Sequence, residues 1–135
     1  MSKSKQLSPP SAQCHCGAGL SYEACCGVFI KDLAKPLTAE ILMRSRYSAF
    51  VEGHERYLLA TWHPRTRPSR VRLDPAQRWL GLRIKRADLS LADASWAEVE
   101  FVARFKINGK GHRLHEIRRF ERIDGCWFYL DGEHL

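Results

Sequence analysis

Four of the five cysteines in this 135-residue chain lie within 13 residues, as Cys14-His15-Cys16-Gly17-Ala18-Gly19, five further residues, and then Cys25-Cys26-Gly27. A disulfide framework is not expected, because the cysteine count is odd and bridges within either close pair would be strained. Two close-spaced cysteine pairs are instead the usual ligand pattern of a structural zinc site. This cluster therefore constrains the fold of the N-terminal region more than any other feature of the sequence.

The residues around the cysteines favour a compact knuckle. Gly17 and Gly19 can adopt positive φ, which allows the chain to turn back after the first pair. Ser21 is a suitable N-cap for a short helix over residues 22–26, which would present the second pair from a helical turn. We therefore predict that one Zn²⁺ is held by four thiolates, those of Cys14, Cys16, Cys25 and Cys26.

Two alternatives to the four-cysteine zinc site remain open from the residues alone. One is a different metal, or a ligand set that includes His15, and the other is a group of free buried thiols. His15 lies between two expected ligands, so we expect its side chain to point outward. Cys126 follows a turn sequence at the start of an apolar strand, where we expect a thiol packed in the core.

The remaining sequence predicts helices followed by strands. Thr38 is an acceptable N-cap for a helix that would end at Gly53, and a second helix is expected over residues 55–62, before Pro64. Strand character returns near residues 79–85, and apolar and charged residues alternate over residues 98–106. Turn sequences at residues 108–111 and 124–125 predict hairpins. We therefore expect an α+β domain with helices packed on one face of a curved antiparallel sheet.

Longer stretches of sequence carry a resemblance to known families. The cysteine segment resembles the SEC-C zinc motif, best known from the C-terminal tail of the preprotein translocase ATPase. Further segments resemble the YchJ-type family: LMRSRYSAF at 42–50, TWHP at 61–64, WLGL at 79–82, FVARF at 101–105 and WFYLDG at 127–132. The resemblance implies a nuclear-transport-factor-like cone, in which the sheet wraps the helices and leaves a cavity. It implies a SEC-C-like motif at 14–27 and the cone at 28–135, and we expect the Ser- and Pro-bearing residues 1–13 to form a flexible tail.

The formal charge of +7 is concentrated between Arg65 and Arg86, where eight basic residues face one acidic residue. Such a segment could attract nucleic acid, the ribosome or an acidic protein. The candidate nucleic-acid contacts are Arg65, Arg67, Arg70 and Arg72, with Trp62 and Trp79 as stacking platforms. The alternative is a solvated loop and strand edge.

A second candidate site lies in the expected cone. Leu114, Glu116, Arg118 and Phe120 share one strand face, which would suit a polar cavity lining, although we favour a sheet surface carrying an exposed ion pair. The residues that would line a functional cavity are Tyr47, His63, Glu116 and Arg118. No Ser/His/Asp order, nucleotide-binding loop or H-E-x-x-H motif is present, so no catalytic residues are assigned.

The sequence offers no membrane or export signal. No apolar stretch approaches the roughly 18 residues that span a bilayer, and residues 1–13 lack the apolar segment of a secretory signal, so we expect a cytoplasmic protein. The leading hypothesis is a zinc-binding, non-enzymatic adaptor with a protein or ribosomal partner. The alternatives are a small-molecule binder or enzyme that uses the cone's cavity, and nucleic-acid binding through the basic segment.

Overall fold

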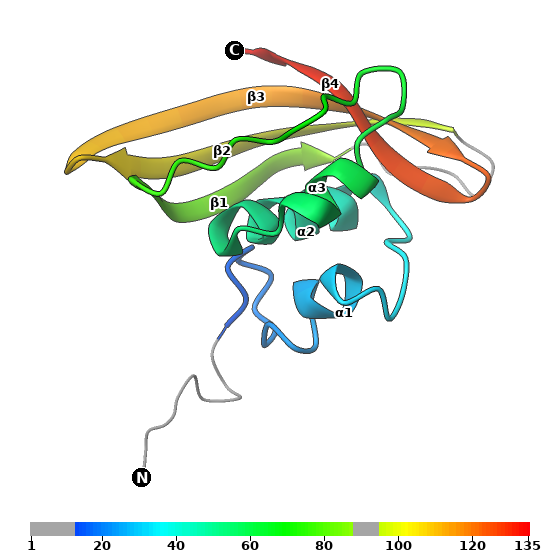
Figure 1. Ribbon diagram of the computed structural model, residues 1–135, viewed down its shortest axis with the longest axis horizontal. Coiled ribbons are helices and arrows are strands. Elements are labelled where there is room, and N and C mark those ends of the chain that lie inside the picture. Colours follow the sequence, from blue (N-terminus) through cyan, green and yellow to red (C-terminus); the bar gives the residue numbers. More distant parts are fainter. Residues whose placement is uncertain (1–12, 88–94) are drawn as a thin grey trace, which may run out of the picture.

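A curved antiparallel sheet lies over a small group of helices (Figure 1). The structure is a computed structural model that describes residues 13–87 and 95–135, so the predicted tail at 1–13 lies outside the described residues except for Gln13. The elements in chain order are α1 (Cys26–Ile30), α2 (Ala39–Glu52), α3 (Glu55–Ala60), β1 (Gln77–Ala87), β2 (Trp96–Ile107), β3 (Lys110–Ile123) and β4 (Cys126–His134). The predicted α+β class is confirmed.

The sheet is a meander in which the strands are neighbours in the order β1-β2-β3-β4, all antiparallel. Asn108 and Gly109 join β2 to β3 with φ of 52° and 79°, and Asp124 and Gly125 join β3 to β4 with φ of 50° and 81°. Two consecutive residues with positive φ match the twist of hairpin strands, which explains the Asn-Gly and Asp-Gly sequences. Both predicted hairpins are confirmed, and the first has a two-residue turn rather than a four-residue one.

Helix α2 begins and ends where its capping residues predict. The Thr38 hydroxyl accepts a hydrogen bond of 3.1 Å from the Ile41 N–H, which satisfies one free donor of the first turn. Gly53 adopts the left-handed conformation at φ 83°, and its N–H donates to the Ala49 carbonyl at 2.8 Å. The predicted helix is therefore confirmed at both ends.

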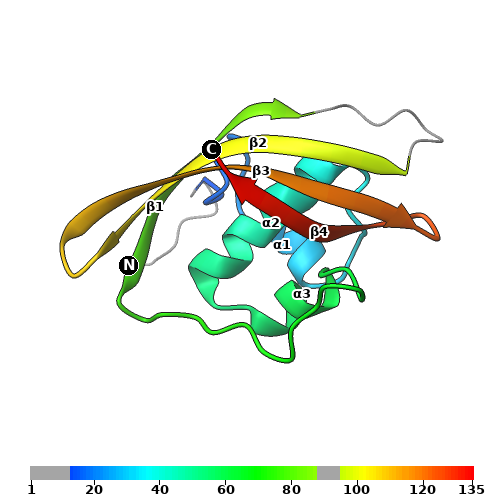
Figure 2. The ribbon, with the colours of Figure 1, turned by 90° about the horizontal axis from the view of Figure 1, so that it is seen from above.

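The main core lies between α2 and the face of the sheet that is turned toward the helices (Figure 2). Its buried residues come from α2 and from strands β2, β3 and β4: Ala39, Leu42, Met43, Tyr47, Ala97, Val99, Phe101, Ala103, Phe120 and Trp127. Alternation along β2 brings Val99, Phe101 and Ala103 to this inner face, as the sequence predicts. The core is thus formed by one face of one long helix and the inner face of the sheet.

A buried arginine joins the helices to β4. Arg46 is 1% exposed, and its Nη1 donates to the Leu58 carbonyl at 2.8 Å and to the Thr61 hydroxyl at 2.7 Å. Its guanidinium lies 5.1 Å from the centre of the Trp62 ring and 4.7 Å from that of Tyr129. Burial lowers the pKa of Arg46 to about 9, since the charged form loses its hydration.

Glu116 and Arg118 face inward, so the expectation that this face of β3 is an exposed sheet surface is wrong. Glu116 is 9% exposed and accepts a hydrogen bond of 2.9 Å from Arg118 Nε. The Arg118 guanidinium lies over the rings of Phe101 and Tyr129, at 4.9 and 5.2 Å from their centres. Aromatic contacts therefore cover the cation, and the ion pair predicted from the i,i+2 spacing forms in the interior.

Among the described residues, no helix has both the length and the apolar character needed to cross a lipid bilayer.

Replacing Leu42 with alanine should destabilise the fold. Leu42 has no exposed surface and lies at the centre of the α2–sheet contact, so the cavity left behind should lower the free energy of unfolding by about 2–5 kcal/mol. Leu33→Ala is the matched control: Leu33 is 74% exposed, and its truncation should change that free energy by less than about 0.5 kcal/mol. Urea denaturation of the metal-loaded proteins measures both values, and equal effects would contradict this account of the core.

Candidate metal centre

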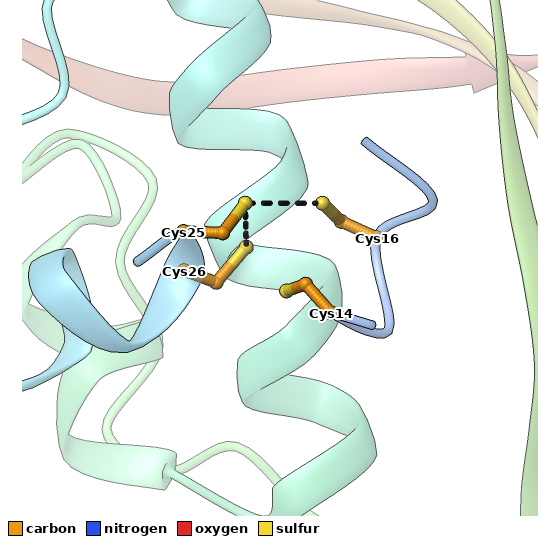
Figure 3. Close-up of side chains that lie close together, drawn as sticks. All are labelled: Cys14, Cys16, Cys25 and Cys26. Carbon is orange, nitrogen blue, oxygen red and sulfur yellow. Dashed lines mark hydrogen bonds between the residues drawn. The ribbon is translucent and has the colours of Figure 1, made fainter. Parts of the chain in front are cut away.

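The four clustered cysteines converge at one point between the N-terminal loop, α1 and α2 (Figure 3). Their four sulfurs all lie within 4.8 Å of one another, with Sγ–Sγ distances of 3.6 Å for Cys16 and Cys25 and 4.0 Å for Cys25 and Cys26. All four are free thiols. A tetrahedral site with metal–sulfur bonds of about 2.3 Å places its sulfurs about 3.8 Å apart, so this arrangement fits a metal ion.

The first cysteine pair lies in a tight loop. The Cys14 N–H donates to the Leu20 carbonyl at 2.7 Å, and the Gly17 N–H donates to the Cys14 carbonyl at 3.2 Å. Gly17 and Gly19 have φ of 81° and 91°, as predicted from the need to turn the chain back. These bonds place Cys14 and Cys16 on the same side of the loop.

The second pair lies across the start of a helix, and the expected helix over residues 22–26 is wrong. Ser21 Oγ accepts a hydrogen bond of 3.3 Å from the Ala24 N–H, but α1 begins only at Cys26, and Cys25 has the non-helical angles φ −123° and ψ −111°. Successive side chains of a continuous helix point about 100° apart. The break at Cys25 therefore lets two adjacent sulfurs approach the same centre.

Helix α2 forms the floor of the site. Ser48 Oγ lies 3.4 Å from Cys14 Sγ, and Arg44 Nη1 donates to the Cys16 carbonyl at 2.8 Å. Glu40 in turn accepts from Arg44 Nε at 2.9 Å. Sequence reasoning assigned neither Arg44 nor Ser48 to the site. Their i,i+4 spacing places them on one helix face, but it does not show that this face contacts the knuckle.

His15 lies outside the sulfur cluster. Its Nε2 pairs with Glu52 Oε2 at 2.9 Å, and its side chain is 39% exposed, in agreement with the expected outward orientation. The other oxygen of Glu52 lies 3.2 Å from His54 Nε2. Although burial opposes ionisation, the hydrogen bonds with His15 and His54 lower the pKa of Glu52. This pairing ties the knuckle to the end of α2.

Electrostatics in the cluster favour a cation. Hydrogen bonds from the Cys16 and Cys26 thiols lower the pKa of Cys14, whereas the bond to Cys14 raises the pKa of Cys26. Burial raises the pKa of Cys25 to about 12. Ionisation of Cys14 is therefore favoured over that of Cys25 and Cys26, which is opposed by burial and by hydrogen bonds to the other thiols. A bound dication removes this opposition, so metal binding must displace thiol protons.

The other site residues predicted from the sequence have separate partners. Cys126 is partly buried at the start of β4 and outside the cluster. Tyr47 packs edge-on against Trp79, and burial raises its pKa to about 12. His63 Nε2 lies 2.7 Å from Glu121 Oε1, so of the four candidate cavity residues the structure pairs only Glu116 with Arg118. A cavity that binds a small molecule stays a prediction.

The four predicted nucleic-acid contacts divide into two kinds. Arg70 Nε pairs with Glu55 at 2.9 Å, and Arg67 donates to the Trp62 carbonyl at 2.8 and 3.0 Å. Arg65 and Arg72 are exposed. The expected stacking platforms are engaged within the fold, because the Trp62 ring packs against Tyr129 and the Trp79 ring packs against Phe105.

Comparison with known proteins places the chain in a family. Residues 38–132 match the family model described as YchJ, middle NTF2-like domain. UPF0225 protein SCO1677 from Streptomyces coelicolor is 52% identical over 126 residues, which cover 93% of this chain and 98% of that protein. The chain belongs to the YchJ-type family. UPF0225 protein RSc0270 from Ralstonia nicotianae is 48% identical, and the match covers 98% of this chain and 99% of that protein.

Two solved structures share the fold. The solution structure of RPA3114, a SEC-C motif containing protein from Rhodopseudomonas palustris, has a TM-score of 0.80 and 30% identity, and the match covers 90% of this chain and 98% of that one. The crystal structure of a SEC-C motif containing protein from Psychrobacter arcticus has a TM-score of 0.74 and 28% identity over 90% and 82% of the chains. The family and the nuclear-transport-factor-like fold predicted from the sequence are confirmed, and the cysteine cluster fits a metal-binding motif.

Replacing Gly27 with alanine should weaken metal binding. A Cβ at Gly27 would lie 2.8 Å from the Tyr22 carbonyl oxygen and 3.0 Å from the Tyr22 ring, so the turn that carries Cys25 and Cys26 would have to shift. We expect Zn²⁺ affinity to fall about 10- to 100-fold, as measured by competition with a chromophoric chelator. Gly111→Ala is the control, since a Cβ there would meet nothing within 4 Å. Unchanged affinity in Gly27→Ala would contradict the proposed geometry of the second pair.

Proposed function

We propose that this protein is a zinc-binding, non-enzymatic adaptor, in which a four-cysteine knuckle fixed to the nuclear-transport-factor-like domain forms part of a docking surface for a protein or ribosomal partner. The convergence of the sulfurs of Cys14, Cys16, Cys25 and Cys26 within 4.8 Å carries the proposal. The metal serves as a structural ion in this account, because four thiolates would complete its coordination and leave no open position for a reacting molecule.

The donor set supports Zn²⁺ as the ion. Thiolate sulfur is a soft ligand that selects zinc, copper(I) or iron–sulfur clusters over magnesium and calcium, and a tetrahedral arrangement of four sulfurs suits zinc. Four thiolates and one dication carry a net charge of −2. Arg44, which bonds to the Cys16 carbonyl, supplies positive charge beside them. Hydrogen bonds to Glu40 and Cys16 raise the pKa of Arg44 against the opposing effect of its burial.

Exposed apolar residues near the knuckle support a docking role. Leu20 is 54% exposed within the knuckle, and Leu33 and Leu37 are 74% and 80% exposed in the segment that leads from α1 to α2. Single exposed leucines are common, but two strongly exposed leucines, Leu33 and Leu37, in one short segment that follows the knuckle and α1 favour a contact surface. The knuckle would fix the position of Leu20 beside its own loop.

Metal analysis tests the zinc site. Protein purified without any chelator should contain one zinc ion per chain. Cys14→Ser or Cys25→Ser should lose the ion during purification, because three sulfurs bind it too weakly. Inductively coupled plasma mass spectrometry gives the stoichiometry, and hydrogen exchange should show loss of protection over residues 14–27. Cys126→Ser is the matched control and should keep its zinc. Full zinc content in either ligand variant would exclude this ligand set.

Affinity capture tests the adaptor role. Proteins retained in stoichiometric amounts by the zinc-loaded wild type should be lost with the double variant Cys14→Ser/Cys16→Ser and kept with Cys126→Ser. Leu33→Ser/Leu37→Ser should retain zinc and lose the same proteins, since these leucines are exposed and make no part of the metal site. Capture of the same proteins by the wild type and all three variants would show that the knuckle is only a structural clamp and would overturn the proposal.

A further inference from the structure

The outer face of the sheet, turned away from the helices, carries an unusual group of cations. Phe101 and Ala103 of β2 point into the core, so the alternate residues on the same strand point outward. The strand register pairs Arg78 with Lys106, Gly81 with Arg104, and Arg104 with Arg113, which places these side chains together on the outer face. We call this group the basic face, and it consists of Arg78, Arg83, Arg104, Lys106 and Arg113.

The basic face has no acidic partners, unlike the rest of the same sheet surface. Toward the other end of the strands, Arg86 lies 3.7 Å from Glu98 and 3.8 Å from Glu100, and Arg119 lies 2.7 Å from Asp131. Within residues 13–87 and 95–135, no side chain of the basic face forms a hydrogen bond or an ion pair. The outer surface therefore divides into an ion-paired half and a purely cationic half.

The arrangement of the basic face costs stability in the free protein. Arg104 and Arg113 are directly opposite each other on β2 and β3. Directly opposed residues of antiparallel strands have Cβ atoms about 4.5–5.5 Å apart, and like charges in that position repel. Lys106 lies two residues from Arg104 on the same strand face and adds to the repulsion. A bound anion would remove this cost.

Two shallow hollows lie among these cations. Arg83, Arg104 and Arg113 surround one of about 200 Å³, and Arg78 and Lys106 border another of about 400 Å³. Gly81 leaves space in the first hollow, because a Cβ at this position would meet no atom within 4 Å. The two hollows follow each other along β1 and β2, so the basic face offers successive anion positions rather than one.

We propose that the basic face binds single-stranded nucleic acid through its phosphates. Successive unpaired cations on one face match a chain of phosphates better than a single small anion. Guanidinium groups suit phosphate oxygens, with which they form paired hydrogen bonds. The residues of the basic face include no aromatic side chain, so binding does not depend on base stacking or on sequence.

The shape of the surface favours a single strand over a duplex. The sheet curves over the helices, so its outer face bulges outward (Figure 1). A rigid double helix would touch such a surface over a small area, whereas a flexible strand can follow it. On the ion-paired half, Glu98, Glu100 and Asp131 neutralise the neighbouring Arg86 and Arg119, which limits the phosphate contact to the cationic half of the surface.

This site differs from the one expected from the sequence. Arg67 and Arg70 of the expected set already bond to Trp62 and Glu55 of the same chain. Arg78 and Arg83 belong to the basic sequence segment, but their partners Arg104, Lys106 and Arg113 come from β2 and β3. The fold therefore brings together cations that no single stretch of sequence displays.

Salt-dependent binding of a labelled oligonucleotide tests the proposal. The zinc-loaded full chain is titrated into fluorescein-labelled oligouridylate of about 20 nucleotides, and fluorescence anisotropy is followed between about 50 and 200 mM KCl. Five phosphate contacts to a single strand predict a slope of log K against log salt of about −3.5. Arg104→Gln/Arg113→Gln should reduce the magnitude of this slope by about 1.4 and weaken binding at least about tenfold at low salt.

A control of equal charge separates position from net charge. Arg70→Gln/Arg119→Gln also removes two cations, but these are paired with Glu55 and Asp131, and we expect at most a twofold change in affinity, roughly the scale of a general charge effect. The thermal midpoint of Arg104→Gln/Arg113→Gln should equal or exceed that of the wild type, because the repulsion is relieved. A matched midpoint also shows that weaker binding does not come from unfolding.

Several results would overturn the proposal. These are the absence of binding at low salt, equal weakening in the two double variants, and tighter binding of a duplex of the same length. Competition by oligoglutamate as effective as that by unlabelled oligouridylate would assign the basic face to an acidic protein instead.

Discussion

The contact between the cysteine knuckle and α2 connects the two parts of this protein. One face of α2 supplies Leu42, Met43 and Tyr47 to the core beneath the sheet, while Arg44 and Ser48 reach the Cys16 carbonyl and the Cys14 sulfur. The same helix is therefore a wall of the domain and the floor of the metal centre. In the proposed zinc-bound form, an ion of a kind that contributes roughly 10–16 kcal/mol to small thiolate modules would stabilise the knuckle, which contacts the domain through α2.

The chemistry of the cluster favours a bound cation beside this connection. The hydrogen bond between Cys14 and Cys26 lowers the pKa of Cys14 and raises that of Cys26, and burial raises the pKa of Cys25. Without metal, the sulfurs would share protons in weak, long contacts such as the 4.0 Å separation of Cys25 and Cys26. A dication replaces these contacts with four bonds to one centre. In the proposed docking role, a bound ion would fix the position of the exposed Leu20 within the knuckle.

The parts of the structure that local chemistry determines could be predicted from the sequence. The cysteine spacing, the Thr38 and Gly53 caps and the Asn-Gly and Asp-Gly turns each depend on residues close together in the chain, and all are found in the structure. The helix break at Cys25 could not be predicted, because it depends on where the other two sulfurs lie. The inward orientation of Glu116 and Arg118 also depends on distant residues, since Phe101 and Tyr129 cover the charge. The roles of Arg44 and Ser48 require the knuckle to be in place.

The distribution of positive charge on the surface also depends on residues that are distant in sequence, and it bears on the proposed binding of nucleic acid. In the sequence, positive charge is densest between Arg65 and Arg86, but in the structure part of it is neutralised by Glu55, and the basic face draws its other members from β2 and β3. Strand alternation places these members on the outer face, because the neighbours of the buried Phe101 and Ala103 on β2, and of the buried Phe120 on β3, point outward. Apart from Val102, which is 6% exposed, the outward positions of β2 from Glu98 to Lys106 carry charged side chains. The outward positions carry opposite charges at one end of the sheet and only positive charges at the other. Because like charges in these positions destabilise the free protein, binding of an anionic ligand accounts for the positive end better than a contribution to folding does.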